Sequence, residues 1–139
     1  MNRFRGILVI LIVFSVLLGG CAHLTRGTGS EEALRQRVAQ VWNAKVNDNW
    51  EVVYDLTVSE YKKKVNRSAF LRGATLDVSE FSIKEITILE SGKEAVATVA
   101  CKASHMGMTF PFTFKETWLL EDDGWRLQLK PLGLPGMDG

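Results

Sequence analysis

The sequence predicts an α+β fold in which N-terminal helices pack on a curved, four-stranded antiparallel sheet. Between residues 30 and 73, apolar side chains recur every three or four positions, as in amphipathic helices. After Gly73 they alternate at every second position, in four runs separated by turn residues. Helices followed by an antiparallel meander form an α+β fold, because the helices cover one face of the sheet.

The first helix is expected to begin after Ser30. Ser30 is a suitable N-cap, and Glu31 and Glu32 follow in the first turn, where negative charge is favourable. The helix is expected to end near Asn47. Its residues at helical spacing are Leu34, Val38, Val41, Trp42, Lys45 and Val46.

Two shorter helices are expected before the sheet. Residues 48–51 have the spacing of a capping box, which predicts a short second helix. Its inward face would carry Trp50, Val53 and Tyr54. A third helical segment is expected over residues 66–72, with Gly73 as its C-terminal stop.

The four strands are separated by predicted turns at residues 90–93, 105–107 and 121–124. In the first strand the alternation slips at residues 84–85, which predicts a bulge. The third strand, residues 108–120, is the longest, and Pro111 within it indicates an edge or an irregular position. Its inward row would be Phe110, Phe112, Phe114, Trp118 and Leu120, and the last strand would turn Trp125, Leu127 and Leu129 to the core.

Residues 1–20 have the layout of a bacterial export signal. Arg3 and Arg5 precede an apolar run over residues 7–18. This run would span about 18 Å as a helix, well short of the roughly 30 Å hydrocarbon layer, so a cleaved signal is favoured over a transmembrane span. Leu18-Gly19-Gly20-Cys21 then resembles the lipobox of bacterial lipoproteins, whose cysteine carries the lipid.

Cleavage after residue 20 would make Cys21 the acylated N-terminus, and two or more acyl chains hold a protein stably on a membrane. In lipoproteins of the enteric pattern, alanine at the next position (Ala22) favours the outer membrane, facing the periplasm. Residues 21–30 would be the lipidated cysteine and a flexible tether, whose nine residues after Cys21 reach about 15–18 Å. Residues 31–131 would form the domain and residues 132–139 a flexible tail.

Composition argues against several classes of site. The 17 basic and 16 acidic residues lack the basic excess of a nucleic-acid-binding protein. Two histidines and two isolated cysteines offer no metal-ligand spacing, so neither a metal nor a cofactor is expected. If Cys21 is acylated, Cys101 has no partner. It is then expected to be a small buried side chain, with a reactive thiol or an intermolecular disulfide as the alternatives.

Several short segments are similar to nuclear transport factor two-like domains, also called SnoaL-like or ketosteroid-isomerase-like domains. They are Asn47-Asp48-Asn49-Trp50, Tyr54-Asp55-Leu56, Ser59-Glu60-Tyr61, Ser68-Ala69-Phe70-Leu71, Trp118-Leu119-Leu120 and Asp123-Gly124-Trp125-Arg126-Leu127. The resemblance covers roughly residues 30–130. It implies a curved sheet wrapped around the helices as a cone with an apolar pocket. Candidate pocket-lining residues are Trp42, Tyr54, Phe112, Phe114 and Trp118.

Glu116 interrupts the apolar row of the long strand. Strict alternation points it inward, where a carboxylate could act as a general acid or base. Enzymes of the ketosteroid-isomerase type combine such a carboxylate with a hydroxyl donor, which Tyr54 or Tyr61 could supply. The alternative is structural: a bulge near residues 115–116 turns Glu116 outward, or Arg126 on the neighbouring strand pairs with it.

Three functions fit these patterns. The first is a membrane-anchored, non-catalytic module that binds a partner protein or another component of the cell envelope. The second is a carrier or sensor of a small apolar ligand, and the third is an enzyme that uses Glu116. We favour the first, because no complete catalytic set can be assembled and a tether restricts the protein to local partners. The outer face of the sheet could also form a homodimer.

Overall fold

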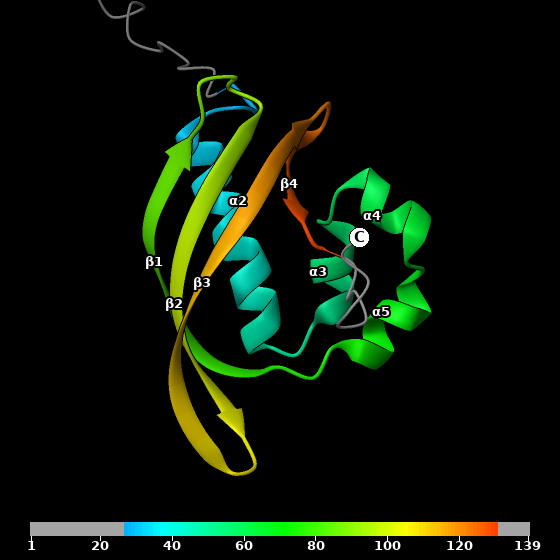
Figure 1. Cartoon of the computed structure of the whole chain (residues 1–139), viewed down its shortest axis with the longest axis vertical. Coiled ribbons are helices and arrows are strands. Elements are labelled where there is room, and N and C mark those ends of the chain that lie inside the picture. Colours follow the sequence, from blue (N-terminus) through cyan, green and yellow to red (C-terminus); the bar gives the residue numbers. More distant parts are fainter. Residues whose placement is uncertain (1–26, 131–139) are drawn as a thin grey trace, which may run out of the picture.

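The computed structural model describes residues 27–130, which contain four helices followed by four antiparallel strands (Figure 1). The predicted α+β fold is confirmed. The predicted signal, Cys21, most of the tether and the tail from residue 131 lie outside the described residues. No helix between residues 27 and 130 is long and apolar enough to cross a membrane.

Helix α2, Glu31–Val46, lies against the concave face of the sheet and begins and ends where predicted. The Ser30 hydroxyl caps it by accepting a hydrogen bond from the Ala33 amide at 3.1 Å, and Asn47 ends it. Helix α2 packs on the sheet because one face is apolar. That face is formed by Leu34, Val38, Val41, Trp42 and Ala44, all buried.

Three short helices follow beside α2. Helix α3, Trp50–Asp55, is capped by Asn49, and α5, Arg67–Gly73, is capped by Asn66. Both were predicted to within one or two residues. Helix α4, Ser59–Lys64, was not predicted, because its residues are mostly polar and Val58 before it offers no side-chain cap.

The strands pair in chain order as β1 (Asp77–Ile88), β2 (Glu94–His105), β3 (Met108–Glu121) and β4 (Gly124–Gln128). The register of β1 against β2 shifts between Ile83 and Glu85, which confirms the predicted bulge, and a second shift lies between Val78 and Glu80. Bulges bend a strand and increase its twist. The sheet therefore curves around α2 (Figure 1).

Strand β3 is much longer than its neighbour β4. Only Thr117–Glu121 pair with β4, so within the described chain no strand pairs with the other side of residues 108–116. This half of β3 forms a hairpin with β2 that extends past the end of α2 (Figure 1). We call residues 108–116 the open edge of β3. Pro111 lies in it, as its sequence position indicated.

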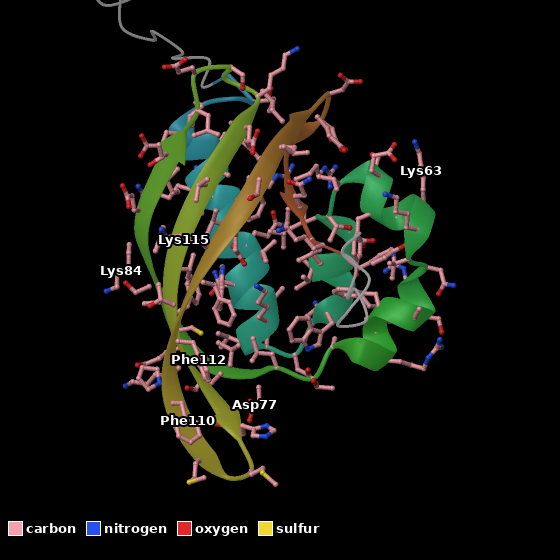
Figure 2. All side chains as sticks on the ribbon, in the orientation of Figure 1. Lys63, Asp77, Lys84, Phe110, Phe112 and Lys115 are labelled. Atoms are coloured by element: carbon pink, nitrogen blue, oxygen red, sulfur yellow. The ribbon has the colours of Figure 1, made fainter. Side chains whose placement is uncertain are left out.

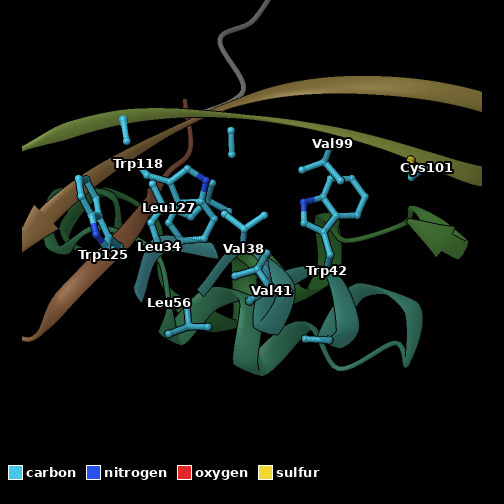
Figure 3. Close-up of a cluster of buried hydrophobic side chains, with 14 of the residues drawn as sticks. Leu34, Val38, Val41, Trp42, Leu56, Val99, Cys101, Trp118, Trp125 and Leu127 are labelled. Carbon is cyan, nitrogen blue, oxygen red and sulfur yellow. The ribbon is translucent and has the colours of Figure 1, made fainter. Parts of the chain in front are cut away.

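The core fills the space between α2 and the sheet (Figure 3). Trp42, Trp118 and Trp125 are its largest members, and each is fully buried. The indole nitrogen of Trp125 donates to the Ser30 carbonyl at 3.3 Å, which connects β4 to the start of α2. The indole nitrogen of Trp118 is buried without a hydrogen-bond partner among the described residues. These side chains occupy the space between α2 and the sheet.

Candidate functional site

Glu116 points inward, as alternation predicted, and is held between α2 and β3. Its carboxylate accepts a hydrogen bond from the Trp42 indole nitrogen at 3.0 Å and another from Lys45 Nζ at 2.9 Å. The side chains of Glu116 and Lys45 are only 9% and 11% exposed. The Lys45 ammonium also lies 3.9 Å from the centroid of the Trp42 ring, where a cation–π contact adds to the ion pair.

Both structural alternatives for Glu116 were wrong. Strands β2 and β3 keep continuous register through Glu116, so no bulge turns it outward. Arg126 pairs with Asp123 and donates to the Asp55 carbonyl at 2.8 Å. Sequence reasoning missed Lys45, although it lies at an apolar position of α2. A lysine and a glutamate that each interrupt an apolar row on facing elements are a signal for a buried ion pair.

The proposed hydroxyl donors do not meet Glu116. The Tyr54 hydroxyl donates to the Val65 carbonyl at 2.9 Å, so the backbone already engages it. Tyr61 lies on α4 and lines a separate cavity, whose charged residues are Lys45 and Lys130 and not Glu116. The Glu116 carboxylate is therefore held in a buried ion pair with Lys45, between α2 and β3. Among residues 27–130, no group of three histidine, cysteine or acidic side chains could hold a metal ion.

That cavity, which we call the helical pocket, lies between the short helices and the end of the sheet. Its volume is about 510 Å³. Apolar and aromatic side chains form most of its wall, and two lysines are its only charged residues. Its lining includes Trp50, Val53, Tyr61, Val65, Phe70, Leu76, Leu127 and Leu129, with Lys45 and Lys130.

The Tyr61 hydroxyl has no hydrogen-bond partner among the described residues. Burial raises the pKa of the Tyr61 phenol, and the nearby Tyr54 adds to this effect. A tyrosine phenol is protonated at neutral pH, and the raised pKa extends this to more alkaline solution, so the hydroxyl can donate a hydrogen bond to an oxygen atom in the pocket.

The five residues predicted to line a pocket lie elsewhere. Trp42 and Trp118 are fully buried in the core, and Tyr54 is buried with its hydroxyl on the backbone. Phe112 and Phe114 are exposed on the hairpin. None of the five lines the helical pocket. The prediction assumed an empty cone, but tryptophan side chains fill the space between α2 and the sheet.

Phe110, Phe112 and Phe114, which we call the aromatic row, were expected in the core but are exposed. Their exposed fractions are 40%, 42% and 36%. Consecutive ring centroids are 6.5 and 6.2 Å apart, and Phe114 lies 5.7 Å from Trp42, which continues the row into the core. Figure 2 shows Phe110 and Phe112 on the part of the hairpin beyond α2. The row is uncovered because α2 ends before it does.

Cys101 lies across from Phe112 on β2 and is buried, as expected. Burial is the main cause of the raised pKa of its thiol, which keeps the sulfur protonated and weakly nucleophilic.

No model of a known protein family matches the sequence, and no curated protein is significantly similar to it. Solved structures do share its fold. A SEC-C motif protein from Psychrobacter arcticus superposes with a TM-score of 0.60 at 11% identity, over 73% of this chain and 61% of that protein. A SEC-C motif protein from Rhodopseudomonas palustris gives 0.54 at 16% identity, over 76% of this chain and 80% of its own.

An NTF2-like transpeptidase from Campylobacter jejuni gives a TM-score of 0.45 at 14% identity, over 69% of this chain and 98% of its own. The present chain spans about three fifths of the Psychrobacter protein. At such low identity the likenesses to the two SEC-C motif proteins concern the fold alone. Unrelated functions share folds, so a shared fold does not define the activity.

Proposed function

We propose that the chain is a lipid-anchored module of the bacterial cell envelope that binds an extended segment of a partner protein along the open edge of β3. The observation that carries the proposal is the aromatic row, three exposed phenylalanines beside a strand edge that no described strand covers. A contiguous exposed apolar patch on a small protein is typical of an interaction surface.

The register of the hairpin shows which backbone groups are free. His105 and Met108 flank the two-residue turn Met106-Gly107, and both turn residues have positive φ, as in a type I′ turn. Hydrogen-bonded and non-hydrogen-bonded pairs alternate from there, so the amides of Thr109, Thr113 and Lys115 face away from β2. Pro111 occupies the remaining outward position, where it removes one donor from the edge.

A strand added at this edge would bond to the outward backbone groups and would place alternate side chains beside the aromatic row. This is β-augmentation, in which main-chain bonds supply affinity and side-chain contacts supply specificity. The partner segment is therefore expected to be extended and apolar at every second position. The missing donor at Pro111 weakens the pairing, which suits a reversible contact.

The position of the predicted anchor favours a protein partner over the membrane itself. Helix α2 begins at the end of the molecule opposite the hairpin tip (Figure 1). If Cys21 is lipidated, residues 22–30 hold the start of α2 within about 15–18 Å of the membrane. The hairpin tip, at the opposite end of the molecule, could then reach partners away from the membrane.

We also propose that residues 30–130 form a nuclear transport factor two-like domain. This assignment rests on the short sequence segments that resemble that family.

Site-specific photo-crosslinking in cells tests this function. A photoreactive phenylalanine analogue replaces Phe112 in the full-length chain, and Lys84 on β1 is the control position. We expect one discrete protein adduct from position 112 and none from position 84. Thr113→Pro removes an outward donor without breaking a bond to β2, so it should abolish the adduct, whereas Thr113→Ser should keep it.

An adduct that survives Thr113→Pro, with unchanged thermal unfolding of that variant, contradicts strand addition. An adduct of twice the chain mass would assign the edge to a second copy of this chain and would overturn the hetero-partner proposal. A lipid adduct would assign the edge to the membrane.

A further inference from the structure

We infer that the helical pocket binds a small amphipathic acid, with its apolar body among the short helices and its carboxylate near Lys130, Lys45 and Tyr61. This site is separate from the aromatic row, and the inference does not depend on the proposed function. None of the residues predicted from the sequence to line a pocket belongs to it.

The size and wall of the pocket suit an apolar body. Ligand pockets in proteins commonly enclose about 300–1,000 Å³, and the helical pocket has about 510 Å³. Its apolar side chains come from three separate parts of the chain: the helix α3, the segment 61–76, and the end of the sheet. They are Val53, Val65, Phe70, Leu76, Leu127 and Leu129.

The way α4 and α5 sit on the molecule supports a cavity rather than a packed interface. Neither helix contributes a fully buried residue. Phe70 of α5 instead contacts three aromatic rings, with centroid distances of 6.4 Å to Trp50, 5.4 Å to Tyr54 and 6.2 Å to Tyr61. These ring contacts hold the two helices in place while the space beneath them stays open.

The charges of the pocket favour an acid over an amine or a neutral alcohol. No acidic side chain lines it, whereas Lys45 and Lys130 do. Glu116 offsets much of the charge of Lys45 but takes only one of its three N–H donors, so Lys45 can still donate to a ligand oxygen. Lys130 adds a positive charge, and the free Tyr61 hydroxyl adds a further donor.

Three eight-carbon probes of similar shape test the inference: octanoate, octan-1-ol and octylamine. Each is titrated by calorimetry at pH 7 into the purified full-length chain in lipid nanodiscs, with empty nanodiscs as the reference. We expect saturable one-to-one binding of octanoate, with affinity at least threefold higher than for octanol and no saturable binding of octylamine. Equal affinity for the three probes, or a preference for the amine, overturns the inference.

Two variants place the site. Lys130→Gln should weaken octanoate binding about threefold to tenfold and leave octanol unchanged, whereas Lys84→Gln, a remote exposed lysine, should change neither. Ala69→Phe fills the pocket wall and should abolish binding of both probes. Because Ala69→Phe could also disturb folding, its circular dichroism is compared with the parent, and Lys130→Gln decides the matter independently. Unchanged octanoate affinity in Lys130→Gln contradicts the charge argument.

One outcome would show that a segment of this chain, and not a separate ligand, occupies the helical pocket. Leu132 and Leu134 lie two and four residues after Lys130 in the sequence. If octanoate binds only when both are changed to serine, the chain's own segment fills the pocket and the inference is overturned.

Discussion

Glu116 and Lys45 are two charged side chains buried between α2 and the sheet. Removing both charges from water costs free energy, which their mutual attraction and the bond from Trp42 offset. Loss of one partner leaves the other charge buried without compensation. The pair therefore specifies how α2 lies on β3 more than it adds to net stability.

We expect Glu116→Gln to lower the free energy of unfolding by about 3 kcal/mol, because it leaves the Lys45 ammonium unpaired. The double variant Lys45→Met/Glu116→Gln should lose only about 1 kcal/mol, since glutamine can still accept from Trp42 and methionine fills the space. Urea denaturation measures both. The control variant Glu80→Gln breaks an ion pair with Lys102 in which the Glu80 and Lys102 side chains are 63% and 56% exposed. It should lower the free energy of unfolding by less than about 1 kcal/mol. Additive losses in the double variant would contradict this account.

The sequence predicted the inward direction of Glu116 but not its partner, because two interrupted apolar rows become a pair only when the elements that carry them are placed face to face. For the aromatic row, the predicted direction of the side chains was correct but their predicted burial was wrong. Alternation correctly placed the three phenylalanines on the concave side of β3. It could not show that α2 ends before that side is covered.

Among the elements, the hairpin between β2 and β3 combines a strained turn with an exposed surface. Met106 has a φ of 53°, a left-handed conformation that costs most non-glycine residues free energy, and its side chain is 87% exposed. Asparagine is the preferred residue at this position of a type I′ turn. Met106 is therefore not the residue that would make this turn most stable.

Met106→Asn should raise the free energy of unfolding by about 0.5–1 kcal/mol through relief of that strain. The midpoint of urea unfolding measures the gain. The control is Met108→Asn on β3, where φ is not positive. This variant should not raise the free energy of unfolding. If the two variants behave alike, the turn conformation is not the source of the effect.

The helices and strands with a buried face were predicted from the sequence, and their bounds agree closely with the structure. Helix α4 was missed because it is polar and begins without a side-chain cap, whereas α5, which has no buried residue either, has Asn66 and Gly73 at its ends. The helical pocket was missed for a related reason. Its walls come from short segments that meet only in the folded chain, and none of them carries a long apolar pattern.

For the whole molecule, the fold and the anchor are separate questions. The α+β fold follows from periodicity in residues 30–130, whereas anchoring rests on the resemblance of residues 18–21 to a lipobox. Acylation at Cys21 would also keep the start of α2 close to the membrane, because only nine residues separate Cys21 from Glu31.

Cys21→Ser should leave an unprocessed chain that still contains residues 1–20 and takes up no labelled palmitate in bacterial cells. Intact-mass spectrometry and acyl labelling measure these two results. Cys101→Ser is the matched control, since its thiol is buried in the sheet, and it should be processed and labelled normally. Normal acylation of the Cys21→Ser chain would refute the predicted anchor.

The open edge of β3 also exposes the protein to a hazard. Met-Thr-Phe-Pro-Phe-Thr-Phe, residues 108–114, is rich in residues that favour strands, and it lies at an edge with free backbone groups. Molecules anchored on one membrane would be confined to a plane, where neighbouring edges meet often. Pro111 and the adjacent Lys115 are the kind of residues that stop such edges from stacking into fibrils. Pro111, together with Lys115, would thus keep binding at this edge reversible and prevent aggregation.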